Sequence, residues 1–150
     1  MSEITFRPIG YVRSPYAAPS EAPPQSVLRE GVQATIEILP EYAQGLQNLA
    51  EHNHIVVLFH FHLSRDYTLL TRTPWSESER GVFSTRSPHR PNPIGMTVAR
   101  LVGIEGNTLT IEGVDMVDGT PVLDIKGWYN KLVPPQAWDE TDRLKNLEDR

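Results

Sequence analysis

The chain has 150 residues, of which 39% are hydrophobic and 22% are charged, and its formal net charge is −5. This length fits a single domain over residues 1–150, and the acidic balance disfavours a small protein that coats nucleic acid, which needs an excess of Lys and Arg. The absence of Cys excludes disulfides, thiolate metal sites and a thiol nucleophile. The sequence has no apolar leader and no long apolar stretch, so we expect a soluble, cytoplasmic protein.

The first part of the chain predicts two strands separated by a long loop. Residues 4–12 are rich in β-forming side chains but contain Pro8, which favours a strand at a sheet edge. Residues 13–30 hold four prolines and are expected to form an extended loop. From residue 31 to residue 38, apolar and polar side chains alternate, which indicates a strand with one buried face.

The next part predicts a helix and the most apolar strand. Residues 40–51 begin with Pro and repeat apolar side chains at helical spacing, so we expect one short helix. Residues 54–62 alternate between two faces, as a strand does. The side chains expected on one face are Ile55, Val57, Phe59 and Phe61.

The rest of the chain predicts four more strands and an exposed terminal helix within residues 134–150. These strands are residues 81–86, 96–105, 108–113 and 121–129, with a hairpin turn at Gly106-Asn107. Because strands recur at short spacing without strand–helix–strand alternation, the fold class is predicted to be all-β and not Rossmann-like. A single small β-barrel or a sandwich, with one or two short peripheral helices, fits this pattern.

Charge is segregated along the chain. Residues 65–100 carry six Arg against three acidic residues, whereas residues 105–124 carry five acidic residues and no basic one. Together the two segments would suit a ligand that has both a carboxylate and hydroxyl or cationic groups. Alternatively, they neutralise each other across adjacent strands, which is the commoner outcome for such charge runs.

Two histidines and one proline-rich loop are candidates for chemistry. His60 and His62 share a face of a strand, as metal-binding pairs do, but no third ligand follows at a diagnostic spacing, so contact with a ligand is favoured over metal binding. The loop at residues 87–95 contains three prolines and is therefore stiff. Arg86, just before this loop, and Arg90 within it would present planar donors to a carboxylate or phosphate. Alternatively, the loop is a rigid connector between strands with arginines on the surface. The sequence contains no serine-nucleophile elbow, phosphate-binding loop or dinucleotide fingerprint.

Four segments resemble one known family. They are Phe83-Ser-Thr-Arg-Ser-Pro-His-Arg-Pro-Asn-Pro-Ile-Gly95, Ile9-Gly-Tyr-Val-Arg-Ser-Pro-Tyr16, Val57-Leu-Phe-His-Phe-His62, and Asp115-Met-Val-Asp-Gly-Thr-Pro-Val-Leu-Asp-Ile-Lys126. In this order along residues 4–126, they are similar to the motifs of the TsaA-like (YaeB-like) family. The resemblance implies a β-barrel enzyme that uses S-adenosylmethionine to methylate N6 of threonylcarbamoyl-adenosine beside the tRNA anticodon.

The resemblance also implies a cofactor site and a homodimer, with the site near the subunit interface. The implied cofactor-binding residues are Pro23, Pro24, Gln25, His62, Leu63, Arg86, Met96, Asp118, Gly119, Thr120 and Pro121. By their chemistry, Arg86 would pair with the methionine carboxylate of the cofactor and Asp118 would accept hydrogen bonds from ribose hydroxyls. No metal is expected. Tyr16, His62 or a carboxylate of the acidic loop are the candidates to orient or deprotonate the acceptor nitrogen.

The chain departs from the family in three places. Lys126 is followed by Gly127-Trp128-Tyr129 rather than Pro-Tyr, and Leu63 stands where a polar residue is common. Longer bacterial members have a C-terminal domain that helps hold tRNA, whereas this sequence ends at Arg150. The alternatives are a non-catalytic S-adenosylmethionine-binding or sensing module, a methyltransferase with a different small acceptor, and a metal-dependent enzyme that uses His60 and His62.

Overall fold

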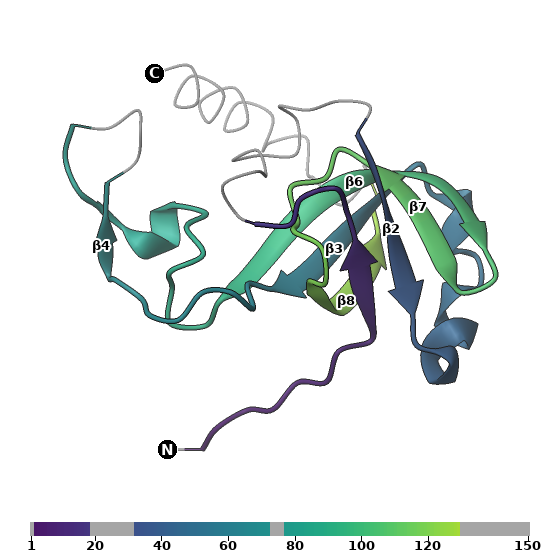
Figure 1. The fold of residues 1–150 in the computed structure, drawn as a ribbon, viewed down its shortest axis with the longest axis horizontal. Helices are drawn as coiled ribbons and strands as arrows, with labels where there is room; N and C mark the ends of the chain where they lie inside the picture. Colours follow the sequence, from purple (N-terminus) through teal and green to yellow (C-terminus); the bar gives the residue numbers. More distant parts are fainter. Residues whose placement is uncertain (1, 19–31, 73–76, 130–150) are drawn as a thin grey trace.

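Six antiparallel strands close a barrel in the computed structural model, which describes residues 2–18, 32–72 and 77–129 (Figure 1). Around the barrel the strands follow the order β1-β2-β7-β6-β3-β8, and β8 pairs with β1 to close it. Their bounds are Gly10–Arg13 for β1, Gln33–Ile38 for β2, His54–His60 for β3, Ile94–Glu105 for β6, Thr108–Glu112 for β7 and Pro121–Gly127 for β8. The prediction of an all-β barrel is confirmed.

The barrel interior is built from the alternating apolar side chains of its strands. On β3, Ile55, Val57 and Phe59 are buried, as the two-residue period predicts. The same alternation buries residues of the other five strands, and these side chains form one cluster. Its strand residues are Val12, Ala34, Ile36, Ile38, Ile55, Val57, Phe59, Ala99, Leu101, Leu109, Ile111 and Val122. Each large aliphatic side chain buried here contributes about 1.5–3 kcal/mol to folding.

Gly95 sits where β6 passes the aromatic end of β3. It pairs with Phe59 across the two strands. A Cβ atom at position 95 would overlap the Phe59 ring, so only glycine leaves room for the ring in this position. The proline-rich loop that precedes Gly95 is thereby anchored against the barrel.

Several predicted elements differ from the observed ones. The helix expected over residues 40–51 is instead two 3-10 helices, η3 (Pro40–Leu46) and η4 (Leu49–Glu51). Asn48 between them has a left-handed backbone with φ of 68°, which interrupts the helix. Neither 3-10 helix contains a buried residue. Leu46 and Leu49 pack against the core but stay partly exposed, so tertiary packing gives little support to a regular α-helix.

Strand boundaries also shift. The first strand begins at Gly10 rather than residue 4, because residues 2–7 are exposed and have no core to cover. The predicted strand over residues 54–62 ends at His60. Phe61 still donates its N–H to the Pro93 carbonyl, but Pro93 has no N–H with which to continue the ladder. The last barrel strand ends at Gly127, two residues before the predicted end. The predicted loop segment 19–30 and the terminal helix at 134–150 lie outside the described residues.

An arm connects β3 to β6 and extends away from the barrel (Figure 1). We define the arm as residues 61–72 and 77–93. The strand predicted over residues 81–86 is here only a two-residue strand, β5 (Arg80–Gly81), paired with β4 (Leu70–Thr71) and followed by η5 (Val82–Ser84). A ladder this short fits a segment with few buried side chains. Among the described residues, no helix is long and apolar enough to cross a membrane.

Candidate functional site

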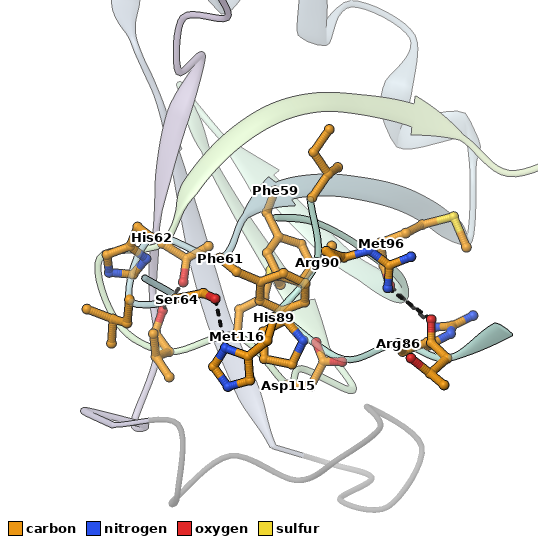
Figure 2. A pocket seen from close by; sticks show the side chains of 17 residues that line it. Phe59, Phe61, His62, Ser64, Arg86, His89, Arg90, Met96, Asp115 and Met116 are labelled. Atoms are coloured by element: carbon orange, nitrogen blue, oxygen red, sulfur yellow. Dashed lines mark hydrogen bonds between the residues drawn. The ribbon is translucent and has the colours of Figure 1, made fainter. Parts of the chain in front are cut away.

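A pocket of about 610 Å³ lies where the end of β3, the start of β6, the arm and the β7–β8 connection meet (Figure 2). This volume is in the range of pockets that hold small molecules, about 300–1,000 Å³. Apolar side chains on its wall include Phe59, Phe61, Leu63, Ile94, Met96 and Met116. Polar and charged ones include His62, Ser64, Arg86, His89, Arg90 and Asp115. The pocket therefore combines an apolar wall with a small number of charged groups.

The structure brings together five of the residues that the family resemblance assigned to the cofactor. His62, Leu63, Arg86, Met96 and Thr120 come from four separate segments and all line the pocket. Their convergence is a consequence of the barrel, because β3 pairs with β6 and β8 on its two sides. Pro23, Pro24 and Gln25 lie outside the described residues.

The remaining assigned residues hold the turn beside the pocket rather than its wall. The side chain of Asp118 is exposed, and its Oδ1 accepts a hydrogen bond from the Ser14 N–H at 3.1 Å. Gly119 has a φ of 81°, which favours glycine, and donates its N–H to the Val12 carbonyl at 2.8 Å. Pro121 begins β8. The role of Asp118 in binding ribose hydroxyls stays a prediction.

The two arginines of the proline-rich loop have different surroundings. Arg90 Nη1 donates to the carbonyls of Thr85 and Ser87, at 2.9 and 3.2 Å, and so fixes the shape of its own loop. Arg86 is exposed, and Nη1 donates to the Met96 carbonyl at 3.3 Å. A guanidinium has five N–H donors, so this one bond orients Arg86 and leaves donors for an anionic ligand.

Ser64 and His89 join the two sides of the arm at the mouth of the pocket. Ser64 Oγ and His89 Nδ1 are 2.9 Å apart (Figure 2). Ser64 directly follows the His62-Leu63 pair, and His89 lies in the proline-rich loop, so this bond ties both assigned segments together. The sequence gives no sign of this pair, because residues 25 positions apart carry no local pattern that indicates contact.

Asp115 is the charged group that the sequence analysis did not single out. It lies between Val114 and Met116, both buried, and its carboxyl group faces the pocket (Figure 2). Burial raises the pKa of Asp115 to about 6, and the nearby Arg86 charge and Thr97 hydroxyl offset only part of that rise. Among the described residues, neither Asp115 Oδ1 nor Thr97 Oγ1 has a hydrogen-bond partner of good geometry. The available signal was a carboxylate between two apolar residues in the connection between β7 and β8.

The two catalytic candidates have different locations. His62 lines the pocket, whereas Tyr16 is 4% exposed, belongs to the core cluster and is not among the lining residues. His60 ends β3 and also lies off the wall, so the expected His60–His62 pair does not face one site. The described part of the chain contains no group of three or more side chains of the kinds that ligate metals.

The sequence matches a known protein family over most of its length. Residues 11–132 match the family described as the tRNA-methyltransferase O N-terminal domain. A probable S-adenosyl-L-methionine-binding protein of Pyrococcus abyssi is 45% identical over 123 residues, 82% of this chain and 67% of the relative. An S-adenosyl-L-methionine-binding protein of Archaeoglobus fulgidus is 42% identical over 86% of this chain and 92% of its own length.

Longer relatives and a solved structure agree with this match. The tRNA (adenine(37)-N6)-methyltransferase of Mus musculus is 41% identical over 89% of this chain, which spans 32% of the mouse protein. The crystal structure of TrmO from Pseudomonas aeruginosa superimposes with a TM-score of 0.74 at 37% identity, covering 87% of this chain and 58% of that one. The resemblance drawn from the four motifs is confirmed: the chain belongs to the tRNA-methyltransferase O family, and it matches the N-terminal domain of that family.

Proposed function

We propose that this protein binds S-adenosylmethionine in the pocket and transfers its methyl group to the exocyclic N6 of an adenosine in tRNA. The acceptor that we favour is threonylcarbamoyl-adenosine next to the anticodon. The observation that carries this proposal is the convergence of three of the four family motifs on one pocket, with Arg86, Met96, His62 and Thr120 on its wall. Relatives described as S-adenosylmethionine-binding proteins and as tRNA methyltransferases support it.

The pocket wall fits the chemistry of this cofactor. S-adenosylmethionine combines an adenine ring and a carbon chain, which suit an apolar wall, with a charged amino-acid end. Phe59, Phe61 and Met116 offer the apolar wall, and Arg86 offers a planar cation for the carboxylate. Asp115 Oδ1 is buried without a hydrogen-bond partner of good geometry among the described residues, and it provides a polar partner on the same wall.

The chemistry needs orientation more than covalent help from the protein. When bound, S-adenosylmethionine supplies an electrophilic methyl group. The residues of this chain have to hold the acceptor in line with that group and exclude water from it. Leu63 and Met96 are among the apolar side chains at the pocket mouth, and these side chains exclude water once an acceptor covers them.

The arm supplies the positive charge that an RNA substrate needs. Arg65 and Arg72 are exposed on it, and Arg80 is half-buried in β5. Contacts of these side chains with phosphates would make binding dependent on salt, with a slope set by the number of neutralised phosphates. Because the whole chain has a net charge of −5, we propose that tRNA binds at the arm and the pocket mouth rather than across the barrel.

We further propose that the protein acts as a homodimer. The arm and pocket mouth expose large apolar side chains, namely Leu63, Tyr67, Leu69, Leu70, Phe83 and Met96. Apolar surface of this kind beside a site commonly marks an interface. Of the tryptophans expected at the interface, Trp128 is 39% exposed, and Trp75 and Trp138 lie outside the described residues. Light scattering at micromolar concentration is expected to give twice the chain mass, and a monomer mass would contradict the dimer.

A non-catalytic cofactor-binding module is the second candidate. It is favoured by the Archaeoglobus relative, which is similar in length to this chain and is described only by its binding of S-adenosyl-L-methionine. By contrast, the mouse methyltransferase is about three times as long as the matched segment.

Mass spectrometry of nucleosides separates the two candidates. We would incubate the protein with tRNA and S-adenosylmethionine that carries a labelled methyl group, then digest the tRNA. Transfer of label to threonylcarbamoyl-adenosine is the expected result. Label on another nucleoside would identify a different acceptor. If no nucleoside carried label while cofactor binding was measured in the same sample, the binding module would be favoured.

A further inference from the structure

The pocket contains a carboxyl group to which the resemblance assigned no individual role. Asp115 lines the wall, yet Oδ1 is buried without a hydrogen-bond partner among the described residues. Thr97, on β6, is 1% exposed and lies off the pocket wall, and its hydroxyl is close enough to Asp115 to lower the pKa of the carboxyl group. Buried polar oxygens are nearly always paired in folded proteins, so Asp115 Oδ1 on the pocket wall indicates that a ligand supplies the missing hydrogen-bond donor.

We propose that Asp115 is the catalytic residue that accepts the proton of the acceptor nitrogen during methyl transfer, an inference that rests on the proposed function. An exocyclic nitrogen on adenine is a poor nucleophile, because its lone pair is delocalised into the ring. A carboxylate that accepts the N–H hydrogen bond keeps the nitrogen oriented and takes the proton as the new bond forms.

The step balances as follows. The nitrogen pair forms the new N–C bond to the methyl carbon, and the electrons of the C–S bond return to sulfur, which becomes a neutral thioether. The N–H bond breaks with its electrons left on nitrogen, and the proton passes to a carboxylate oxygen of Asp115. Water then takes the proton from Asp115 when the product leaves.

The electrostatics of the site agree with this role. A base has to be ionised at the working pH and still bind a proton readily, so a pKa near that pH is the most effective. Burial moves the pKa of Asp115 to about 6, closer to neutrality than an exposed Asp. The other titratable or charged side chains on the wall are His62, His89, Arg86 and Arg90. Of these, Arg86 acts on Asp115 and keeps part of the population ionised.

His62 is the competing base, and the two differ in their connections. His62 lies on the pocket wall in the tight turn that ends β3, where its backbone N–H donates to the His60 carbonyl. Asp115 is instead held from both sides by buried neighbours, Val114 and Met116, which fix its direction. A rigid carboxylate with an unpaired oxygen is better suited to receive a proton at a defined point.

Asp115→Asn is the test, because it keeps the shape and removes the base. We would measure three quantities: affinity for S-adenosylmethionine and for S-adenosylhomocysteine by calorimetry, the single-turnover methylation rate of tRNA against pH, and the pKa of residue 115 by carboxyl NMR in the cofactor-free protein. Asp124→Asn is the matched control, since Asp124 lies on β8 beside Lys126 and off the pocket wall.

The expected result separates binding from chemistry. Asp115→Asn should bind both cofactor forms within about twofold of the original protein, and its single-turnover rate should fall by about 10²–10⁴. The original protein should gain rate as pH rises through the NMR-measured pKa of Asp115 and then level off, and the variant should lose that inflection. Asp124→Asn should keep both the rate and the profile.

Three outcomes would overturn the proposal. An unchanged rate in Asp115→Asn removes Asp115 from proton transfer while leaving the proposed function intact. A loss of affinity for the sulfonium cofactor without a matching loss for the neutral thioether would make Asp115 a partner of the cofactor's charge instead. If the original protein binds cofactor but methylates no nucleoside, the proposed function fails, and the role of Asp115 fails with it.

Discussion

The wall of β1, β2 and β7 and the end of the molecule that holds the arm and pocket are built on opposite principles. The wall repeats one pattern, with buried aliphatic side chains such as Ile36, Leu109 and Ile111 at every second position. The pocket end breaks that pattern with exposed apolar side chains and with a buried carboxylate oxygen, Asp115 Oδ1, that has no hydrogen-bond partner of good geometry in the described part of the chain. The difference teaches that stability and ligand binding are supplied by separate parts of a small barrel.

A core substitution should have the largest effect and should test the scaffold alone. Ile55→Ala removes a fully buried side chain from β3 and is expected to lower the free energy of unfolding by about 2–5 kcal/mol. The control Val102→Ala, at an exposed position of β6, should cost less than about 0.5 kcal/mol. Urea denaturation measures both. Equal effects of the two substitutions would contradict the description of the core.

The pH dependence of stability should distinguish the pocket end from the wall. The pKa of Asp115 is raised from 3.8 to about 6 on folding, so the folded protein binds more protons than the unfolded chain between these values. The stability that this residue contributes is therefore complete below pH 3.8 and is lost as pH rises through 6.

This loss can be measured against Asp115→Asn, which does not titrate. Relative to that variant, the original protein should lose up to about 3 kcal/mol of unfolding free energy as the pH rises from about 3 to about 7. Denaturant titrations at a series of pH values give the difference, in which other groups cancel. A difference that stays constant with pH would show that the pKa is not raised.

Removing Arg86 should weaken ligand binding without affecting the scaffold. Arg86 is exposed and makes one weak bond, to the Met96 carbonyl. Arg86→Ala is expected to lower S-adenosylmethionine affinity by about 1.5–3 kcal/mol, the value of a hydrogen bond to a charged group, and to leave the melting temperature nearly unchanged. Calorimetry and thermal denaturation check both parts. Unchanged affinity would remove Arg86 from the site.

Charge reversal on the arm should have the smallest effect and should act on RNA alone. Arg72 and Arg80 lie off the pocket wall, and the variants are Arg72→Glu and Arg80→Glu. Each is expected to lower tRNA affinity at moderate salt by about tenfold or less and to reduce the salt slope by about 1, because one phosphate contact is lost. Cofactor affinity should not change. Filter binding over a range of salt concentrations measures the tRNA affinity and the salt slope. If neither variant changed them, tRNA would bind at a different surface.

The sequence predicted best those parts of the fold that have a local pattern, such as alternating side chains or turn residues. Alternation predicted the buried face of β3, and turn residues predicted the hairpin between β6 and β7. The arm could not be predicted in the same way, because its two strands have two residues each and η5 has three, which is too short for a periodic pattern. The prediction of a helix over residues 40–51 was wrong because Leu46 and Leu49 are only partly buried against the core, and the left-handed backbone of Asn48 interrupts the helix between them.

The same contrast between local patterns and contacts in the folded chain applies to the candidate site. Motif resemblance identified His62, Leu63, Arg86, Met96 and Thr120, which the barrel brings to one wall. It gave no individual role to Asp115 or to the Ser64–His89 bond, since burial and pairing across the pocket arise only in the folded chain.

The central claim is that the cofactor binds at the pocket end and not on the wall. Titration of the ¹⁵N-labelled protein with S-adenosylhomocysteine, followed by NMR, tests it most directly. The amide signals of Leu63, Arg86, Met96 and Thr120 are expected to shift, and those of Thr35 and Thr110, in a shallow depression on the wall, should stay unchanged. Shifts concentrated at Thr35 and Thr110, with none at Arg86 and Met96, would contradict the account.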